Sequence, residues 1–429
     1  MTKAKFSLIF CVLSLAITQI FITCKKENAV PAAKNYSDTV KSVNEQIYAT
    51  MKQYYLWYDS LPVVNPDSST DPQKFINSIV NRRDKWSFIL TDKQYQAEFV
   101  TGAYAGHGFS TGFDKDSKLR IAYVFNSSDL HTAGVTRGWI IKSVNGIIPD
   151  TTNSNTIFGA STAGIQNTFT FTRPDGKDTV LTFVKKEIIR NTVLSYDTLH
   201  VGNKVVGYIS FLAFELDADA ALKTAITYLM QNNATDLVLD LRYNGGGSAT
   251  TAQNLANMLA GKLANGKPFV HYTYNDKNSR YNDTWNFSST AVSLNLSRLF
   301  VITTHGTASA SELIINGLRP YMNVRMIGSR TDGKPVGMNQ FQLNYNYYLY
   351  PIMFQITNAN NYGDYFDGLP VDQQEVDDLT HDFGDRNEAC MSQALNYIQY
   401  GSFLSTSKAA KMPSKIYHEW EPFTNVMVK

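Results

Sequence analysis

Two residues suited to nucleophilic catalysis lie close together in the sequence. Ser309 stands in the small-residue run 306–310, directly before a predicted helix, and Lys334 follows 25 positions later on a glycine-rich turn. A serine hydroxyl is a weak nucleophile until a base removes its proton. An unperturbed lysine amine is neutral in only about one molecule in a few thousand at pH 7. Lys334 can therefore act as the base only if burial lowers its pKa to roughly 7 to 8, which costs about 4 kcal/mol.

The predicted helix after Ser309 would place free backbone N–H groups beside the hydroxyl. These groups and the helix dipole favour developing negative charge, so the amide of Ala310 is predicted to donate to an oxyanion. A simpler interpretation needs no enzyme. Ser309 and Glu312 stand three residues apart ahead of an apolar run, as in a capping box, and Lys334 would then be a solvated loop lysine.

A second loop contains three consecutive glycines. The apolar run 237–241 predicts a buried strand, and Gly245, Gly246 and Gly247 follow shortly after it. Glycines in this position allow backbone amides to approach a ligand closely. The lysine and threonine of a P-loop are missing, as is the G-x-G-x-x-G pattern of a dinucleotide site. An oxyanion loop, with Gly246 or Gly247 as the donor, fits better.

Both loops belong to a region in which strands and helices alternate. Val205 to Phe211 and Leu299 to Thr303 are apolar strand patterns, and Leu222, Ile226 and Leu229 mark a helix between them. This alternation predicts an α/β core over residues 189–405. Its last helix would span Asn387 to Ile398 and contain Cys390.

Residues 104–188 have a different character, with short strands separated by turns. A hairpin is predicted with arms at Thr168 to Arg173 and Thr179 to Val184. The segment from Ala133 to Gly146 resembles the core of a PDZ domain. Such domains bind peptides by strand addition and hold the terminal carboxylate in backbone amides. A generic small β domain is the alternative interpretation.

On the PDZ resemblance, one loop is predicted to bind substrate. It consists of Gly106, His107, Gly108 and Phe109, which match the carboxylate-binding loop. His107 is interpreted chiefly as a loop residue, with a substrate contact as the alternative.

Residues 36–103 are predicted to form a small N-terminal helical segment. Apolar residues recur every three or four positions up to Tyr54, which indicates an amphipathic helix. Asp71 and Pro72 mark the start of a second helix, with an aspartate cap and proline at the first position.

The N-terminus has the pattern of a secretory signal. Residues 1–23 place Lys3 and Lys5 before an apolar stretch that ends at Cys24. This resembles a bacterial lipoprotein signal, which implies lipidation of Cys24 and a polar tether at 24–35. A plain signal peptide or a short membrane anchor is the alternative. The prediction is a membrane-anchored lipoprotein of the bacterial cell envelope, periplasmic or surface-exposed.

Composition limits the remaining possibilities. The 429 residues have room for two or three domains, and 43% apolar content can fill sizeable cores. The formal charge of +2 falls to zero without Lys3 and Lys5, so nothing favours nucleic acid. Only Cys390 lies in the predicted folded body, so no intramolecular disulfide is expected. The seven histidines show no ligand spacing, and neither a metal nor a cofactor is predicted.

The two loop motifs together resemble those of one protease family. Residues 237–247 read LVLDLRYNGGG, residues 307–312 read TASASE, and the lysine follows. The combination is similar to the C-terminal processing peptidases, or tail-specific proteases. This resemblance implies a mixed α/β fold with a crotonase-like or ClpP-like β/α core, an inserted PDZ domain and a Ser-Lys dyad. Carried onto this sequence, Ser309 is the nucleophile, Lys334 the general base, and Ala310 with Gly246 or Gly247 the oxyanion hole.

Two positions depart from the family pattern. The family commonly has a glutamine four residues after its lysine to orient the amine, and here that position is Met338. Gln340 or Asn339 is the predicted substitute.

Pro335 directly follows Lys334 and restricts it to extended conformations. His305, near the serine, is an alternative member of a triad, although closeness in sequence does not establish contact.

The sequence therefore predicts an envelope-anchored serine endopeptidase that cleaves proteins near their unstructured C-termini. A catalytically silent, PDZ-bearing lipoprotein that binds peptides or scaffolds another protease is the main alternative. A crotonase-like acyl-CoA enzyme shares the oxyanion chemistry but leaves the PDZ-like segment and the dyad spacing unexplained. Residues 406–429 are predicted to be a C-terminal extension.

Overall fold

The computed structural model describes residues 43–405 and 416–418, apart from 67–68, 97–98, 100–102, 155, 216–217 and 344–346. The predicted signal, Cys24 and the tether lie outside these residues, as does most of the C-terminal extension. Within the described part, no helix has the length and apolar character needed to cross a membrane.

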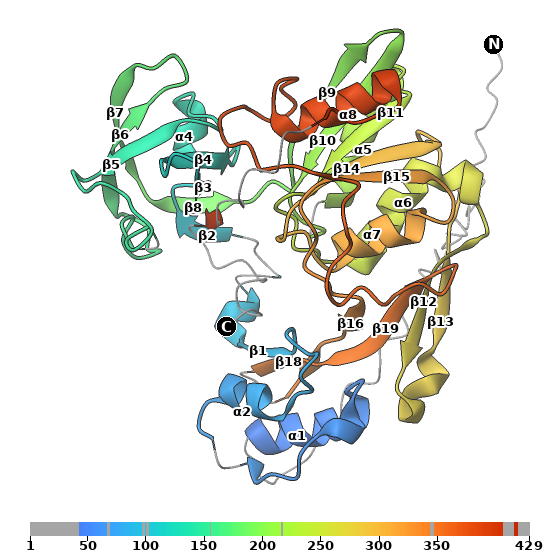
Figure 1. The fold of residues 1–429 in the computed structure, drawn as a ribbon. Coiled ribbons are helices and arrows are strands. Elements are labelled where there is room, and N and C mark those ends of the chain that lie inside the picture. Colours follow the sequence, from blue (N-terminus) through green and yellow to red (C-terminus); the bar gives the residue numbers. More distant parts are fainter. Residues whose placement is uncertain are drawn as a thin grey trace, which may run out of the picture.

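A six-stranded sheet forms the centre of the molecule (Figure 1). Its strand order is β20-β15-β14-β11-β10-β9. The antiparallel edge strand β9 precedes five parallel strands, which agrees with the predicted α/β core. The strands are β9 (Val193–Val201), β10 (Lys204–Phe211), β11 (Asp236–Asp240), β14 (Arg298–Thr303), β15 (Asn323–Gly328) and β20 (Gln373–Gln374).

Helices cover both faces of this sheet. One face packs against α5 (Ala218–Gln231), α6 (Ala249–Ala264) and α7 (Ala310–Leu318), and the other against α8 (Ala389–Tyr400). Leu237 and Leu239 of β11 point to the first layer, and Val238 points to the second. Because both faces are buried, β11 reads as a continuous apolar run rather than an alternating one.

The N-terminal segment contains the predicted helices and also a strand. These elements are α1 (Val43–Tyr54), η1 (Tyr58–Ser60), α2 (Pro72–Ile79), β1 (Phe88–Thr91) and α3 (Asp92–Tyr95). Asp71 caps α2 as predicted, accepting a 3.1 Å hydrogen bond from the amide of Lys74. The strand was not predicted: β1 pairs with β18 (Tyr347–Tyr350), which pairs in turn with β17 (Phe341–Gln342). Four residues carry too little pattern to reveal a strand whose partner lies about 260 positions away.

A four-stranded antiparallel sheet lies beside the core, in the order β13-β12-β19-β16. Its elements are β12 (Pro268–Tyr274), η4 (Asp276–Tyr281), β13 (Asp283–Asn286), β16 (Val336–Met338) and β19 (Ile352–Asn358). Strand β16 begins two residues after Lys334 and pairs with β19 from Val336 onward. This pairing fixes the direction in which the chain leaves Lys334.

Residues 103–189 form an inserted β-domain with its own hydrophobic core, centred on Phe109, Phe169 and Phe171. The predicted hairpin is present as β6 (Gln166–Thr172) and β7 (Asp178–Val184). The other elements are β2 (Ala103–Gly106), β3 (Phe109–Phe113), β4 (Leu119–Val124), α4 (Asp129–Thr132), β5 (Ile140–Val144) and β8 (Lys186–Ile189). Strands β2 and β8 pair where the chain enters and leaves the domain. A last strand, β21 (Ile416–His418), adds to the edge at β3.

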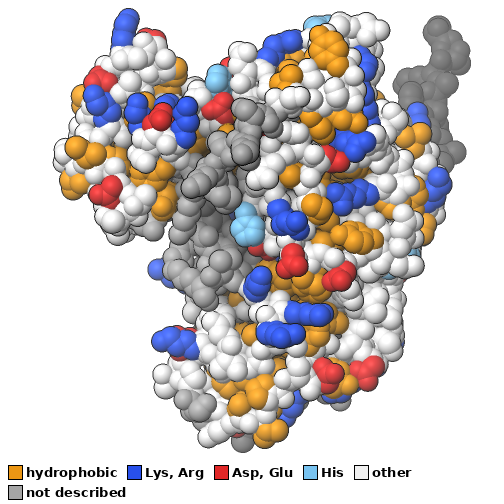
Figure 2. Space-filling view, in the orientation of Figure 1, with side chains coloured by type: hydrophobic (Ala, Val, Ile, Leu, Met, Phe, Trp, Pro, Cys, Tyr) orange, Lys and Arg blue, Asp and Glu red, His pale blue; other side chains and the backbone are white. Residues whose placement is uncertain are grey.

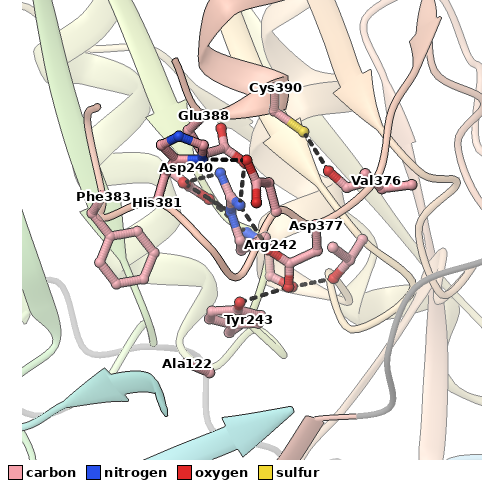
Figure 3. Close-up of polar contacts among 12 residues, drawn as sticks. Ala122, Asp240, Arg242, Tyr243, Val376, Asp377, His381, Phe383, Glu388 and Cys390 are labelled. Atoms are coloured by element: carbon pink, nitrogen blue, oxygen red, sulfur yellow. Dashed lines mark hydrogen bonds and ion pairs between the residues drawn. The ribbon is translucent and has the colours of Figure 1, made fainter. Parts of the chain in front are cut away.

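A buried polar network joins the inserted β-domain to the core. Arg137 of the β-domain is 3% exposed, and its guanidinium lies 2.7 Å from a carboxylate oxygen of Asp377. Figure 3 shows Arg242 of the core among the carboxylates of Asp240, Asp377 and Glu388. Burial opposes ionisation of Asp377, but the two arginines outweigh burial and lower its pKa to about 2.

Charges of both signs are interspersed on the face shown in Figure 2, with hydrophobic side chains between them. No field of one sign covers that face, which agrees with the small formal charge of the chain, +2.

Candidate active site

The loops that follow β11 and β14 meet at one edge of the central sheet. The two strands are parallel neighbours, with Val238 opposite Phe300 and Asp240 opposite Ile302. The carboxyl ends of neighbouring parallel strands lie together, and ligands of α/β proteins bind beyond them. The glycine loop and the Ser309 loop are therefore brought side by side by the sheet.

Hydrogen bonds join these two loops. The Thr307 hydroxyl donates to the carbonyl of Leu241 at 2.8 Å. The carbonyl of Asn244 accepts from the amide of Ala308 at 3.1 Å and from the hydroxyl of Ser311 at 2.9 Å. Thr307, Asn244 and Ser311 are all buried, so solvent does not compete for these bonds.

The backbone of Ser309 is strained. Its φ is +56° and its ψ is −114°, whereas Ser248, which caps α6, has a φ of −66° in the extended region. An ordinary N-cap adopts that extended region, and non-glycine residues rarely have a positive φ. One of the two hydrogen bonds of the predicted capping box is present: the Glu312 carboxylate accepts a 2.9 Å hydrogen bond from the Ser309 amide. Capping alone does not explain a strained conformation at this position.

Gly246 lies directly against the Ser309 turn. It has a φ of +107°, and a Cβ at this position would lie 2.8 Å from Ser309 Cβ and 3.0 Å from the Ala310 nitrogen. Only glycine satisfies both the backbone conformation and this close approach. The glycine loop and the amide of Ala310 therefore border the same small space beside Ser309.

The two candidate loop amides differ. The amide of Gly246 donates to Asn244 Oδ1 at 2.9 Å, so it is occupied in this structure. Gly247 has a φ of +131° and is exposed, and the contacts of the described residues show no acceptor for its amide. Of the two glycines, Gly247 is the one with an amide available to a substrate.

Glu312 connects the segment of Ser309 to that of Lys334. This carboxylate is fully buried; Oε1 accepts from the Thr331 hydroxyl at 2.6 Å and from the Gly333 amide at 2.8 Å. Oε2 accepts from the amide of Ser309 at 2.9 Å and from that of Lys334 at 2.8 Å. Two bonds to one oxygen place those backbone nitrogens within about 6 Å of each other. Ser309 and Lys334 are thus neighbours in space.

Lys334 has the environment that the sequence analysis required of a lysine base. It is 4% exposed, and burial lowers the pKa of its amine to about 8. The carboxylates of Asp332, Asp84 and Glu312 act in the opposite direction but are outweighed. The amine is therefore partly neutral near neutral pH, and the interpretation of Lys334 as a solvated loop lysine is wrong.

Glu312 itself is held at an unusual pKa. Burial raises the pKa of its carboxyl to about 7, although its four hydrogen-bond donors favour the ionised form. The sequence suggested Glu312 only as a helix cap. No spacing signal showed that the same carboxylate would receive Gly333 and Lys334 from a loop about 20 residues further on.

Two other acidic residues near Lys334 were missed by the sequence analysis. Asp332 accepts from the indole of Trp86 at 3.1 Å, and its own amide donates to the carbonyl of Thr307 at 3.0 Å. Asp84, also from the N-terminal segment, accepts from the amide of Trp86 at 2.8 Å. The N-terminal segment thus supplies part of the electrostatic environment of Lys334. Isolated aspartates some 250 residues apart give no recognisable pattern.

The residues proposed to orient Lys334 have other partners. Gln340 is exposed and accepts from the hydroxyl of Tyr350 at 2.9 Å. Asn339 lies beside the side chain of Tyr274 and acts to lower its pKa. Met338 packs against the hydrophobic core. None of these contacts involves Lys334, so an orienting role for Gln340 or Asn339 stays a prediction.

The predicted peptide-binding loop keeps its side chains inside the β-domain. His107 is 2% exposed, lies 3.1 Å from Asn167 Oδ1, and has its pKa lowered to about 4 by burial. Phe109 is part of the domain core. A peptide contact at Gly106–Phe109 would therefore involve the loop backbone rather than these two side chains. His305, the alternative triad member, is exposed on its turn.

The described residues contain no group of three histidine, cysteine or acidic side chains arranged to hold a metal ion. A serine activated by a lysine requires neither a metal nor an organic cofactor.

Two family profiles match this chain. The profile described as "Peptidase family S41" matches residues 205–364, which contain both loops and Lys334. The profile described as "Peptidase S41 N-terminal domain" matches residues 42–88, the segment that supplies Asp84. Residues 42–88 and 205–364 thus carry the two domains of peptidase family S41. The resemblance to C-terminal processing peptidases is thereby confirmed, as is the mixed α/β fold.

Individual S41 relatives are more distant. A "Probable CtpA-like serine protease" of Staphylococcus aureus (strain N315) is 28% identical over 267 residues, covering 59% of this chain and 49% of that protein. A protein of the same name from Staphylococcus saprophyticus is 24% identical, covering 70% and 58%. The chain thus spans about half the length of the curated relatives it matches.

A solved S41 structure shares the fold over most of the chain. This structure, from Bacteroides fragilis NCTC 9343 and provisionally named as an S41 protease, has a TM-score of 0.71 and 26% sequence identity. The match covers 84% of this chain and 98% of that one.

Proposed function

We propose that this S41 protein is a serine endopeptidase with Ser309 as the nucleophile and Lys334 as the general base. One observation carries the proposal: Glu312 Oε2 accepts the backbone amides of both residues, which brings a strained serine and a buried lysine of lowered pKa together. Either feature alone has a structural explanation. Their convergence on one carboxylate beside a glycine loop supports nucleophilic catalysis at Ser309.

In the proposed first step, the neutral amine of Lys334 takes the proton of the Ser309 hydroxyl while Oγ attacks the peptide carbonyl carbon. The resulting ammonium then gives that proton to the departing amine, which leaves an ester on Ser309. In the second half, Lys334 takes a proton from water while the water oxygen attacks the ester carbon. The ammonium then returns that proton to Ser309 Oγ as the ester C–O bond breaks and the carboxylic acid product leaves. Each half-reaction uses the same amine, first as base and then as acid.

Negative charge on the carbonyl oxygen would be stabilised by the amides of Ala310 and Gly247. Ala310 begins α7, where unpaired amides and the helix dipole favour an anion. Gly246 is assigned a spacing role, because its own amide is held by Asn244. Its missing side chain leaves the room in which the oxyanion would lie.

We further propose that the enzyme acts near the C-termini of unfolded protein substrates in the bacterial cell envelope, anchored by a lipid on Cys24. The family relationship and the leader pattern support this. The inserted β-domain would act as a PDZ-like module that binds the tail and presents it to Ser309. Protein or peptide substrates, rather than nucleic acid, are the expected partners.

The test is hydrolysis of a casein substrate by the full chain in detergent, compared with the Ser309→Ala and Lys334→Ala variants. Both substitutions are expected to reduce the rate by at least about a thousandfold, because the nucleophile and its base act as a unit. The Ser248→Ala variant, which alters the ordinary cap of α6, is the matched control. Activity that survives Ser309→Ala would contradict the assignment.

Selectivity for C-termini requires a separate comparison. A fluorescent peptide with a free terminal carboxylate and the same peptide with a terminal amide are offered to the enzyme. The free carboxylate is expected to lower KM, and mass spectrometry should place the cuts near the tail. Equal hydrolysis of both peptides would leave a serine endopeptidase without tail selectivity.

A further inference from the structure

The chain places one of its own C-terminal segments on the edge of the inserted β-domain. Strand β21 pairs antiparallel with β3, with Ile416 opposite Gly112, Tyr417 opposite Thr111 and His418 opposite Ser110. In Figure 1 it appears as a short red strand next to the elements of that domain. The pairing joins segments about 300 residues apart in the sequence.

The direction of β21 is that of a peptide bound by strand addition. Strand β3 directly follows the loop Gly106–Phe109, and β21 runs toward that loop as its residue numbers rise. A tail bound at such an edge extends antiparallel to the strand and points its carboxyl end at the loop. The segment thus occupies, in the same orientation, the edge proposed to receive substrate tails.

Side chains reinforce the backbone pairing. The Ser110 hydroxyl donates to the carbonyl of Tyr417 at 2.9 Å, and Ser110 is fully buried. The ring of Tyr417 meets that of Phe113 edge-on at 5.9 Å. Ile416 packs against the apolar cluster of Ala122 and its neighbours between the β-domain and the core. The segment is therefore held at the edge by both polar and apolar side-chain contacts.

The opposite edge of the same sheet provides a comparison. Strand β7 is the outer strand there, and no described strand pairs with it on its free side. Val180 and Val184 of β7 are exposed, at 62% and 46%. Any free edge can recruit a strand through its unpaired backbone groups. The C-terminal segment pairs with the edge that begins at the Gly106–Phe109 loop.

We propose that residues 416–418 are a built-in ligand of the β3 edge, so that the chain's own C-terminal segment competes with incoming peptide tails. The consequence for proteolysis rests on the proposed function, whereas the competition for peptide does not. A tethered ligand has an effective concentration on the order of millimolar. Even a weak self-ligand at that concentration keeps the edge mostly occupied and weakens the apparent binding of a free peptide.

The first test measures peptide binding without catalysis, using the Ser309→Ala variant of the full chain. The probe is a fluorescein-labelled peptide with the sequence of residues 414–420, SKIYHEW. A chain that ends at residue 405 is expected to bind this probe about fivefold or more tightly than the full chain, by fluorescence anisotropy. A probe with proline in place of Ile416 and Tyr417 should not bind, because proline cannot donate to the ladder. Equal affinity in the full and shortened chains would overturn the proposal.

The second test holds the segment in place without removing it. Residues directly opposite on antiparallel strands lie at disulfide distance, so Gly112→Cys with Ile416→Cys should form a bond on oxidation. Gly112→Cys with Tyr417→Cys is the control, because adjacent strand residues face opposite sides of the sheet. The oxidised Gly112/Ile416 pair should lose binding of the SKIYHEW probe and regain it on reduction. Probe binding that is unchanged by this bond would refute the competition, as would a bond formed only in the control pair.

Hydrolysis then tests the consequence for catalysis separately. With Ser309 intact, the chain ending at 405 is expected to show a lower KM for a tailed peptide and an unchanged kcat. An inactive enzyme that still binds the probe as described would contradict the proposed function and leave the self-ligand intact. An active enzyme whose full and shortened chains bind the probe equally would support the proposed function and contradict the self-ligand.

Discussion

At the scale of single residues, the proposed chemistry depends on a lysine kept partly neutral. Lys334 is 4% exposed, and burial lowers its pKa to about 8 against the pull of three carboxylates. The protonated amine is therefore destabilised inside the protein relative to the unfolded chain. This has one consequence for the rate and one for stability.

The rate of hydrolysis is expected to follow the neutral form of Lys334. Above pH 8 the amine is mostly neutral, and below it the neutral fraction falls about tenfold per pH unit. The value of kcat/KM for a peptide substrate should thus rise with an apparent pKa of about 8. A stopped-time assay from pH 6 to 10 measures this. A rate that declines across that range would contradict a lysine base.

Removing the Lys334 charge should stabilise the fold while abolishing activity. The folded pKa is lowered, so the unfolded chain binds the extra proton between pH 8 and 10.5, and stability rises with pH across this window. The Lys334→Met variant is therefore expected to be more stable than the natural chain by about 1 to 3 kcal/mol at pH 7. The difference should shrink toward pH 10.5. Urea denaturation of the inactive variant checks this, and a less stable variant would show that Lys334 is held by favourable ion pairs.

At the scale of elements, the site depends on two loops that leave neighbouring parallel strands. The loop after β11 presses Gly246 against Ser309, and the loop after β14 continues into α7. Glu312 on the first turn of α7 then receives the Gly333–Lys334 turn. Ser309 and Lys334, the proposed reacting residues, are thus positioned by contacts between loops.

Gly246→Ala is expected to disrupt this junction. The new Cβ would lie 2.8 Å from Ser309 Cβ and 2.9 Å from the carbonyl of Ala308, on a backbone with φ of +107°. We expect activity to fall at least a hundredfold, with a stability loss of about 2 to 4 kcal/mol from overlap and strain together.

Gly266→Ala is the matched control for Gly246→Ala. Gly266 also has a positive φ, +75°, but a Cβ there meets nothing within 4 Å. Its substitution should cost only about 1 to 2 kcal/mol of conformational strain and leave kcat/KM unchanged. Thermal denaturation and peptide hydrolysis compare the two variants. Equal activity losses would show that contact with Ser309 is not the cause.

At the scale of the whole molecule, the β-domain is fastened to the core through buried charges. Arg137 donates to the carbonyl of Ala122 within its own domain, and to the Tyr243 hydroxyl and Asp377 in the core. Tyr243 stands one residue before Asn244, whose carbonyl holds the Ser309 loop. The domain proposed to bind a tail is thus tied to the loop that borders Ser309.

Removing the Arg137 contacts should lower the stability of the fold substantially. Arg137→Met leaves Asp377 and backbone carbonyls buried with fewer partners, and we expect a stability loss of about 2 to 4 kcal/mol. Lys142→Met is the control. It removes an ion pair of similar length, 2.6 Å to Asp178, in which both side chains are half exposed, and should change stability far less than Arg137→Met does. Urea denaturation measures both variants; equal losses would mean that burial does not strengthen the Arg137 contacts.

The amino-acid sequence alone determined the main secondary-structure elements and the two loop motifs that carry the family resemblance. Local hydrophobic periodicity and turn residues predicted several elements that are present in the structure. These are the strands β10, β11 and β14, the Asp71 cap of α2 and the β6–β7 hairpin. The glycine loop and the 307–312 motif together identified family S41. These are properties of contiguous segments, which is why they can be read without a structure.

Only the tertiary structure decided how distant segments combine. Glu312 accepts hydrogen bonds from both Ser309 and Lys334. Asp84 reaches Lys334 from the N-terminal segment, and β21 pairs with β3. Each of these contacts joins residues far apart in the chain. The burial of Lys334 and the occupied amide of Gly246 likewise depend on neighbours from other elements. Burial, pKa and hydrogen-bond partners arise from packing in three dimensions, and no local pattern encodes them.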